Sequence, residues 1–231
     1  MSSSTPQGAR ARARMEITAA IKDEARRQLA AEGAAKLSLR AVARQLGMVS
    51  SALYRYFPSR DDLLTALIID AYDSLGESAE AAHGKAADAG PVRRWTAVAE
   101  AVRDWALQHP HEYALIYGSP VPGYTAPDTT VPAASRVGLL FIGIVRDAHH
   151  ASALTELAPL PAELRAEAER MAADLAPDLP PATVAALVAA WAELFGLVGF
   201  ELFGQFHRVV EDREPFFRQA VTRLAQGVGL G

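Results

Sequence analysis

The chain has 231 residues, half of them hydrophobic, and no cysteine. This composition is that of a globular protein with a sizeable core, and it excludes disulfides and thiolate metal sites. The first 20 residues carry basic charge but no apolar run, so no secretory signal is expected and we predict a cytoplasmic protein. The net charge of −4 hides an asymmetry, because residues 1–60 carry +7 and the remainder −11. A basic head on an acidic body predicts that a polyanion such as DNA binds at the head.

Residues 1–14 consist mainly of Ser, Ala, Gly and Arg and show no apolar period. This pattern predicts a disordered basic arm. Arg10, Arg12 and Arg14 alternate with Ala, and two interpretations stay open for them. The arm either lies along phosphates or in the minor groove of DNA, or is a solvated tail that aids solubility.

A three-helix unit is expected over residues 15–59. Met15–Glu32 has apolar residues at helical spacing and forms the first helix. Ser38 is a good N-cap for a second helix, which stops where Gly47 permits a left-handed backbone. A third helix, Ser50–Phe57, follows and ends at Pro58. Two short helices joined by a glycine turn are the geometry of a helix-turn-helix DNA-binding unit.

The stretch from Ile17 to Leu64, about 48 of the 231 residues, also resembles the TetR-type transcriptional regulators. The resemblance is specific because several residue types recur at fixed offsets. They are the Ser-capped helix, Ala43, Leu46-Gly47, Leu53-Tyr54, the aromatic residues Tyr56 and Phe57, and the run from Ser59 to Leu64. The resemblance implies a DNA-binding head followed by a ligand-binding and dimerisation body, here residues 60–231, without a cofactor.

Helical patterns dominate the body, so we predict an all-α fold. Gly118–Pro132 is expected to be a long loop, because it contains four prolines and two glycines. The expected helices are Arg60–Leu75 with an end near Gly76, Val92–Gln108, Tyr113–Tyr117, Ser135–His150, Pro161–Leu175, Thr183–Val209 and Pro215–Gly227.

Small and polar side chains on Ser50–Tyr56 predict how the head reads DNA. Ser accepts or donates at any base edge, and Ala contacts a thymine methyl group. The family usually has Ser or Thr where Val49 stands, so the helix begins at Val49 or at Ser50. The candidate base contacts are Ser50, Ser51, Ala52, Arg55 and Tyr56. The candidate phosphate contacts are Ser38, Arg40, Arg44, Arg60 and, by its likeness to the family position, Tyr54.

A single helix-turn-helix buries too little surface for specific affinity, so a homodimer on a palindromic double-stranded operator is expected. Small residues recur along Thr183–Val209 at spacings of three and four, which permits close helix approach. We predict that this helix and Pro215–Leu224 form the dimer surface, with intramolecular packing as the alternative. Glu193 and Glu201 interrupt the apolar run, so no membrane contact is expected.

Aromatic residues of the body predict a mostly apolar pocket for a hydrophobic small-molecule effector. The alternative is that most of them only fill the core. The body also resembles a TetR subgroup with a Trp-His-Gly helix, in which Trp191 and Gly196 match while Phe195 replaces the His. The candidate ligand residues are Trp95, Trp105, Tyr113, Tyr117, Phe141, Trp191, Phe195 and Phe200.

A metal site and an enzyme active site are not indicated by the sequence. His109 and His111 flank a proline rather than sharing a helix face, and Asp147, His149 and His150 suit a helix end, so no metal site is predicted. The sequence shows no nucleophile elbow, phosphate loop or dinucleotide fingerprint, so no enzyme is expected. A homodimeric repressor released by a small molecule is the main prediction. A ligand-independent architectural DNA-binding protein or, less favoured, a small-molecule-transforming enzyme is the alternative.

Overall fold

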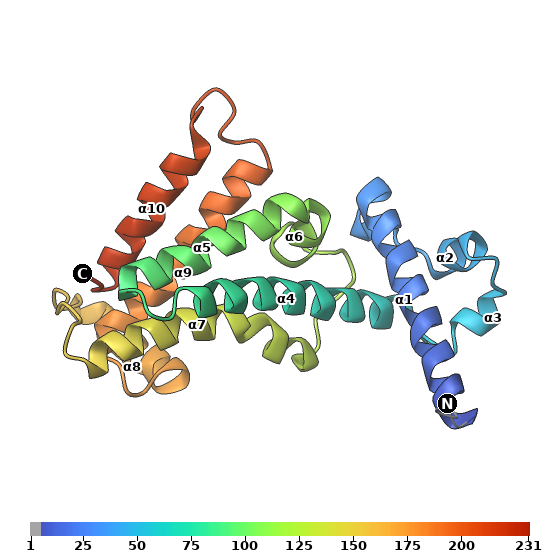
Figure 1. Ribbon diagram of the computed structural model, residues 1–231, viewed down its shortest axis with the longest axis horizontal. Helices are drawn as coiled ribbons and strands as arrows, with labels where there is room; N and C mark the ends of the chain where they lie inside the picture. The colour runs from blue at the N-terminus through green and yellow to red at the C-terminus, as the bar shows by residue number, and fades with distance from the viewer. Residues whose placement is uncertain (1–5) are drawn as a thin grey trace. The chain divides into compact units, whose positions relative to one another are not determined.

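The computed structural model describes residues 6–231, in which every regular element is a helix and no strand occurs (Figure 1), which confirms the all-α prediction. Two compact units can be separated: unit 1 comprises Met1–Ala71 and His111–Thr130, and unit 2 comprises Tyr72–Pro110 and Val131–Gly231. The helices are α1 (Pro6–Glu32), α2 (Leu39–Gln45), α3 (Ser50–Leu53), α4 (Arg60–Lys85), α5 (Pro91–Gln108), α6 (Pro110–Tyr117), α7 (Val131–His150), α8 (Ala162–Leu175), α9 (Pro181–Leu202) and α10 (Arg213–Gly227), with 3-10 turns η1 (Ala34–Lys36) and η2 (Asp128–Thr130).

The core of unit 1 is formed by the apolar faces of α1, α2, α3 and the first half of α4. Ile21, Val42, Leu53 and Leu63 are fully buried there because each lies on the inward stripe of its helix. The segment after α6 packs against the same core, and the hydroxyl groups of Tyr124 and Thr65 lie 2.9 Å apart. The three helices expected to fold as a head are therefore completed by two further segments.

The first helix begins earlier than the sequence predicted. Residues 6–14 belong to α1, so the prediction of a disordered arm is wrong for them, and residues 1–5 lie outside the described part. Ala and Arg are among the strongest helix formers, so residues 8–14 extend the helix although all of them are exposed. Apolar periodicity alone does not indicate this extension, because residues 6–14 have no apolar period.

The fourth helix starts as predicted and ends later. Ser59 and Asp62 form a reciprocal cap, in which Asp62 N donates to Ser59 Oγ at 3.1 Å and Ser59 Oγ donates to Asp62 Oδ2 at 2.7 Å. The expected end at Gly76 is wrong, because α4 continues to Lys85. One buried glycine costs a helix only about 1 kcal/mol, which tertiary packing outweighs.

Unit 2 is a bundle in which α5 packs against α7, α9 and α10, while α8 packs on α9 (Figure 1). Its core contains Trp95 and Val102 of α5, Phe141 and Ile144 of α7, and Leu194 of α9, all with at most 4% of their surface exposed. Two segments, Asp128–His150 and Pro181–Leu202, are long and apolar enough to cross a membrane by length and composition. Both contribute buried side chains to this core, and core helices pass the same test.

Two other helices end earlier in the structure than the sequence predicted. The recognition helix is shorter than Ser50–Phe57, since α3 ends at Leu53 and continues as a hydrogen-bonded turn to Phe57 N, which donates to Leu53 O. The helix predicted as Thr183–Val209 ends at Leu202, before Gly204 takes a φ of +84°. The predicted division into residues 15–59 and 60–231 stays a prediction; the compact units divide the chain within α4, after Ala71.

Candidate DNA-binding surface and apolar cavity

The turn between α2 and α3 has the geometry of a helix-turn-helix. Ser38 Oγ accepts from Ala41 N at 3.4 Å and caps α2. Gly47 has a φ of +65°, a conformation that glycine adopts without a Cβ penalty, and it reverses the chain. Val49 is the N-cap of α3 and makes no side-chain cap bond, while its carbonyl accepts from Ala52 N at 2.9 Å. The first helical residue of α3 is therefore Ser50.

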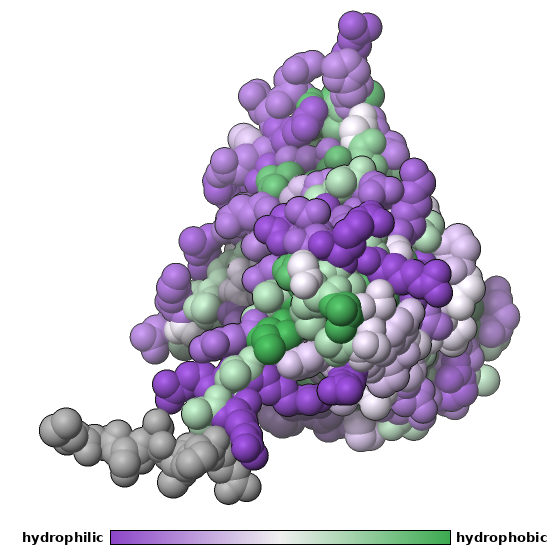
Figure 2. Space-filling model, turned by 90° about the vertical axis from the view of Figure 1, so that its right-hand side faces the viewer, coloured by the Kyte–Doolittle hydropathy of each residue, from purple (hydrophilic) through white to green (hydrophobic). Residues whose placement is uncertain are grey.

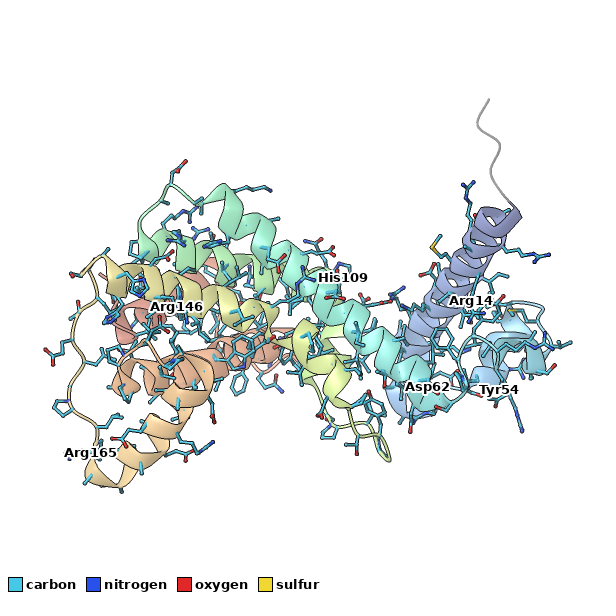
Figure 3. All side chains as sticks on the ribbon, turned by 90° about the horizontal axis from the view of Figure 1, so that it is seen from below. Arg14, Tyr54, Asp62, His109, Arg146 and Arg165 are labelled. Carbon is cyan, nitrogen blue, oxygen red and sulfur yellow. The ribbon has the colours of Figure 1, made fainter. Side chains whose placement is uncertain are left out.

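Most of the predicted DNA contacts are exposed side chains of unit 1. Figure 2 looks onto this end of the chain and shows a small apolar group surrounded by hydrophilic side chains. Tyr54, which Figure 3 labels just beyond α3, is 41% exposed. The exposed candidates are Arg40, Arg44, Ser50, Ser51, Tyr54 and Arg55; Ser38, Ala52, Tyr56 and Arg60 are half-buried.

Three of the half-buried candidates have structural roles. Ser38 caps α2, and Arg60 Nη2 donates to the carbonyl oxygens of Ala34 at 2.9 Å and Ala35 at 3.3 Å. Tyr56 packs against the head core, with the Arg14 guanidinium 5.1 Å from its ring centroid. These residues position the helix-turn-helix, whereas the exposed residues are free to approach a duplex.

Sequence reasoning missed Val49 as a residue of this surface, and it did not predict the contacts that Arg14 makes there. Val49 is 70% exposed although it is apolar, and it lies immediately before α3. Arg14 Nη2 donates to Arg55 O at 3.4 Å, which links α1 to the end of the recognition segment. The signal for Val49 was its replacement of a capping residue. Arg14 was expected in the basic arm, but its contact with the recognition segment joins residues 41 positions apart, so no local pattern indicated it.

A cavity of about 360 Å³ lies within unit 2, between α5, α7, α8 and α9. Trp95, Phe141 and Trp191 provide its aromatic surface. The rest of the wall is mostly aliphatic, with Ser135 and Asp174 as its side chains with polar oxygen atoms. Trp95 Nε1 is buried and has no hydrogen-bond partner among the described residues. An apolar wall with few polar groups suits an uncharged hydrophobic ligand.

The eight aromatic residues predicted for one pocket fall into several places. Trp95, Phe141 and Trp191 line the cavity, and Phe195 lies beside Trp191 with ring centroids 4.5 Å apart. Trp105 stacks on His109 and donates its indole N–H to Ser74 Oγ at 2.9 Å. The Tyr113–Tyr117 pair belongs to unit 1, and Phe200 lies on a different face of α9. The predicted set is thus divided among a cavity, two packing sites and a surface.

The side chains considered as metal ligands in the sequence include two with other contacts in the structure. His109 stacks on Trp105, and Asp147 accepts from Arg94 at 2.7 Å. Arg94 also donates to His83 Nε2, and burial together with the Arg94 charge lowers the pKa of His83 below its usual value of 6.5. Within residues 6–231 no three His, Asp or Glu side chains converge as metal ligands.

One face of α9 and α10 exposes small and aromatic apolar residues. Ala189, Ala192 and Gly196 of α9 are exposed, and Phe200 and Phe216 expose 54% and 44% of their surface. Phe206 lies between these two rings, with centroids 5.8 and 5.6 Å away. These three small residues of the predicted packing stripe therefore lie on the surface of a single chain rather than in its core.

Two protein families match the sequence. The family described as bacterial regulatory proteins, tetR family, matches residues 21–67, which include the helix-turn-helix. The family described as tetracyclin repressor-like, C-terminal domain, matches residues 95–224, more than half of the chain. The two matches together include the recognition segment and every helix that lines the cavity.

Individual relatives agree with these families. The chain is 41% identical to the HTH-type transcriptional regulator Rv1816 of Mycobacterium tuberculosis over 96% of this chain and 95% of the relative. Its structure is similar to that of the regulatory protein SCO4313, with 35% identity, a TM-score of 0.74 and coverage of 93% and 98% of the two chains. RolR, solved with the ligand resorcinol, has the same fold at 15% identity and a TM-score of 0.55, with 94% of each chain covered.

The helix-turn-helix geometry, the family matches and the near full-length relatives lead to one assignment. Regulators of this kind bind DNA and are not enzymes. The chain belongs to the TetR family of bacterial DNA-binding transcriptional regulators.

Proposed function

We propose that the protein is a homodimeric repressor that holds a palindromic operator and releases it when a hydrophobic small molecule enters the cavity of unit 2. The observation that carries the proposal is the double role of α7. Its residues Ser135, Gly138 and Phe141 line the cavity, while Arg136 between them binds α4, the helix that begins in the DNA-binding head. A ligand that displaced α7 would act on α4 directly.

In the DNA-bound form, the α3 helix of each chain enters the major groove. Ser50, Ser51 and Ala52 face base edges, and their small side chains allow a deep approach. Tyr54, Arg40 and Arg44 contact phosphates, because hydroxyl and guanidinium groups at the edges of a reading helix fix its position on the backbone. The exposure of all these side chains except the half-buried Ala52 supports this arrangement.

The homodimer is formed by the exposed face of α9 and α10. Ala189, Ala192 and Gly196 allow the corresponding helix of a second chain to approach closely. Phe200 and Phe216 lie beside them and would be removed from water by the same contact. Two heads held in this way match two half-sites, so the operator mirrors the two-fold symmetry of the protein.

The effector is small and mainly apolar. A volume of about 360 Å³ equals that of about twelve water molecules in the liquid, and the wall offers few polar partners. The resorcinol complex of RolR supports the idea that this fold accommodates a small molecule. To act, the ligand must prefer the form that does not bind DNA; a 100-fold preference corresponds to about 2.7 kcal/mol per site. We place this regulation in the bacterial cytoplasm.

The test is selection of genomic fragments by the purified protein, followed by mobility shifts with the selected site. The proposal predicts a palindromic site whose binding is saturable, lost in Ser51→Tyr, and reversed by a compound found to bind the cavity. Leu187→Trp, which fills the cavity, should keep operator binding and abolish the response to that compound. Binding without sequence preference that disappears at moderate salt would favour an architectural DNA-binding protein instead.

A further inference from the structure

The N-terminal turns of α1 extend beyond the core that holds the rest of that helix. Residues 8–16 are all exposed, and the first fully buried residue of α1 is Ile21. Packing adds little stability to helical turns that bury no apolar surface. Their exposed side chains are accessible to a binding partner. These turns present Arg10, Arg12 and Arg14.

Arg14 fixes the position of these turns against the recognition segment. Its guanidinium lies over the Tyr56 ring at 5.1 Å and donates to Arg55 O at 3.4 Å. Arg55 and Tyr56 follow Tyr54, the C-cap of α3, and Arg55 is exposed. Figure 3 labels Arg14 on α1 and Tyr54 beyond α3, both within unit 1. The basic end of α1 is therefore continuous with the DNA-binding surface.

Helix geometry separates the three arginines into two faces. At 100° per residue, Arg10 lies about 40° from Arg14, whereas Arg12 lies about 200° from it. Arg10 is thus one turn beyond Arg14 on the face that looks toward the recognition segment. Arg12 points to the opposite side of the same helix.

The charges at this end of α1 are not neutralised within the protein. Further along the helix, Lys22 pairs with Asp70, Arg26 pairs with Asp23 and Asp70, and Arg27 pairs with Glu24. Neither Arg10 nor Arg14 forms an ion pair with a carboxylate of the described chain. Unpaired guanidinium groups beside a recognition helix match the phosphates of the duplex that the helix approaches.

We propose that the start of α1 is a second DNA-contacting element, in which Arg10 and Arg14 bind backbone phosphates flanking the base pairs that α3 reads. The inference rests on the proposed placement of α3 in the major groove. An α-helix is about 10 Å wide and the minor groove about 6 Å, so the helical form excludes insertion of these turns into that groove. The contact is to the backbone and adds affinity and position rather than sequence information.

The experiment measures binding of the full chain to the selected operator and to an unrelated duplex by fluorescence anisotropy at several salt concentrations. Arg10→Ala is expected to reduce the slope of log affinity against log salt by about 0.9 on both duplexes, the value for one lost phosphate contact. Arg10→Lys should retain the slope, because the charge remains. Arg12→Ala is the matched control: it removes the same charge from the same exposed helix, but from the opposite face, and should leave the slope unchanged.

Arg14→Ala serves as a second variant, checked by thermal unfolding because Arg14 also packs on Tyr56. Equal slopes for Arg10→Ala and Arg12→Ala would overturn the inference, since the effect would then be one of net charge and not of a placed contact. An unchanged slope for Arg10→Ala would overturn it as well. Because the slope is also measured on the unrelated duplex, these results are independent of whether a palindromic operator exists; failure of the wild type to prefer any site would instead contradict the proposed function.

Discussion

Arg136 of α7 lies so close over Gly76 of α4 that a β-carbon at Gly76 would be 2.6 Å from Arg136 Nε. From this position the guanidinium donates to both carboxylate oxygens of Glu80 at 2.8 Å, and its Nη1 donates to the Asp73 carbonyl and carboxylate at 3.0 and 2.8 Å. The glycine that the sequence indicated as a helix end is thus the point where a second helix is held against α4.

Two helix-interior glycines should respond in opposite ways to alanine. Gly76→Ala is expected to lower the free energy of unfolding by about 1–3 kcal/mol, because the new methyl group overlaps Arg136. Gly138→Ala should raise it by up to about 1 kcal/mol, because the methyl group would lie 3.5 Å from the Trp191 ring and alanine favours the helix. Chemical denaturation of both variants tests this pair. Stabilisation by Gly76→Ala would contradict the close approach of Arg136.

The Arg136–Glu80 pair predicts a pH dependence. The hydrogen bond from Arg136 lowers the pKa of Glu80 below its usual value of 4.5. The unfolded chain therefore binds this proton more readily, so the pair stabilises the fold above pH 4.5 and loses its effect as the pH falls below that value. The loss of stability caused by Glu80→Gln should be largest near pH 7, below about 1 kcal/mol because Glu80 is exposed, and should shrink toward pH 3. A difference that is constant across this range would contradict the prediction.

A buried ion pair between α5 and α9 should matter more. Arg103 donates to both oxygens of Glu201 at 2.7 and 2.6 Å, and the two side chains are only 12% and 6% exposed. Glu201→Ala leaves the guanidinium charge buried without its partner and is expected to cost about 3 kcal/mol. The double variant Arg103→Met with Glu201→Leu should recover most of this loss. Arg170→Ala, at a surface pair, is the control and should have no measurable effect.

The N-cap of α3 offers a gain in stability. Val49 makes no side-chain cap bond, and its extended backbone conformation is one in which serine caps a helix. Val49→Ser is therefore expected to raise the free energy of unfolding by about 1 kcal/mol. If the exposed Val49 methyl groups touch a thymine in the operator, the same change should weaken operator binding while stabilising the protein. An unchanged melting temperature would contradict the cap argument.

The head could be predicted closely from the sequence because its signals are local. Ser38, Gly47 and the Ser59–Asp62 cap each fix a helix end through residues no more than three positions apart, and the structure shows all of them. The extension of α1 was not predicted, because residues 6–14 are helical by intrinsic propensity and carry no apolar stripe.

The cavity could be predicted only in character. Apolar stripes on α5, α7 and α9 indicated that aromatic residues face inward, but no local pattern states which stripes face one another. Trp95 and Phe141 meet at 4.3 Å although they are 46 positions apart, whereas Tyr113 and Tyr117 pack within another unit. The continuation of α4 through Gly76 was also not visible in a local pattern, since Arg136, which packs over this glycine, is 60 positions away.

The most direct test of the central claim is the stoichiometry of the complex with the selected operator, measured by analytical ultracentrifugation on the full palindrome and on a single half-site. The account predicts an even number of chains on the palindrome and much weaker binding to the half-site, because two heads are joined through α9 and α10. One chain bound to the palindrome, with an affinity equal to that for the half-site, would contradict the dimeric repressor.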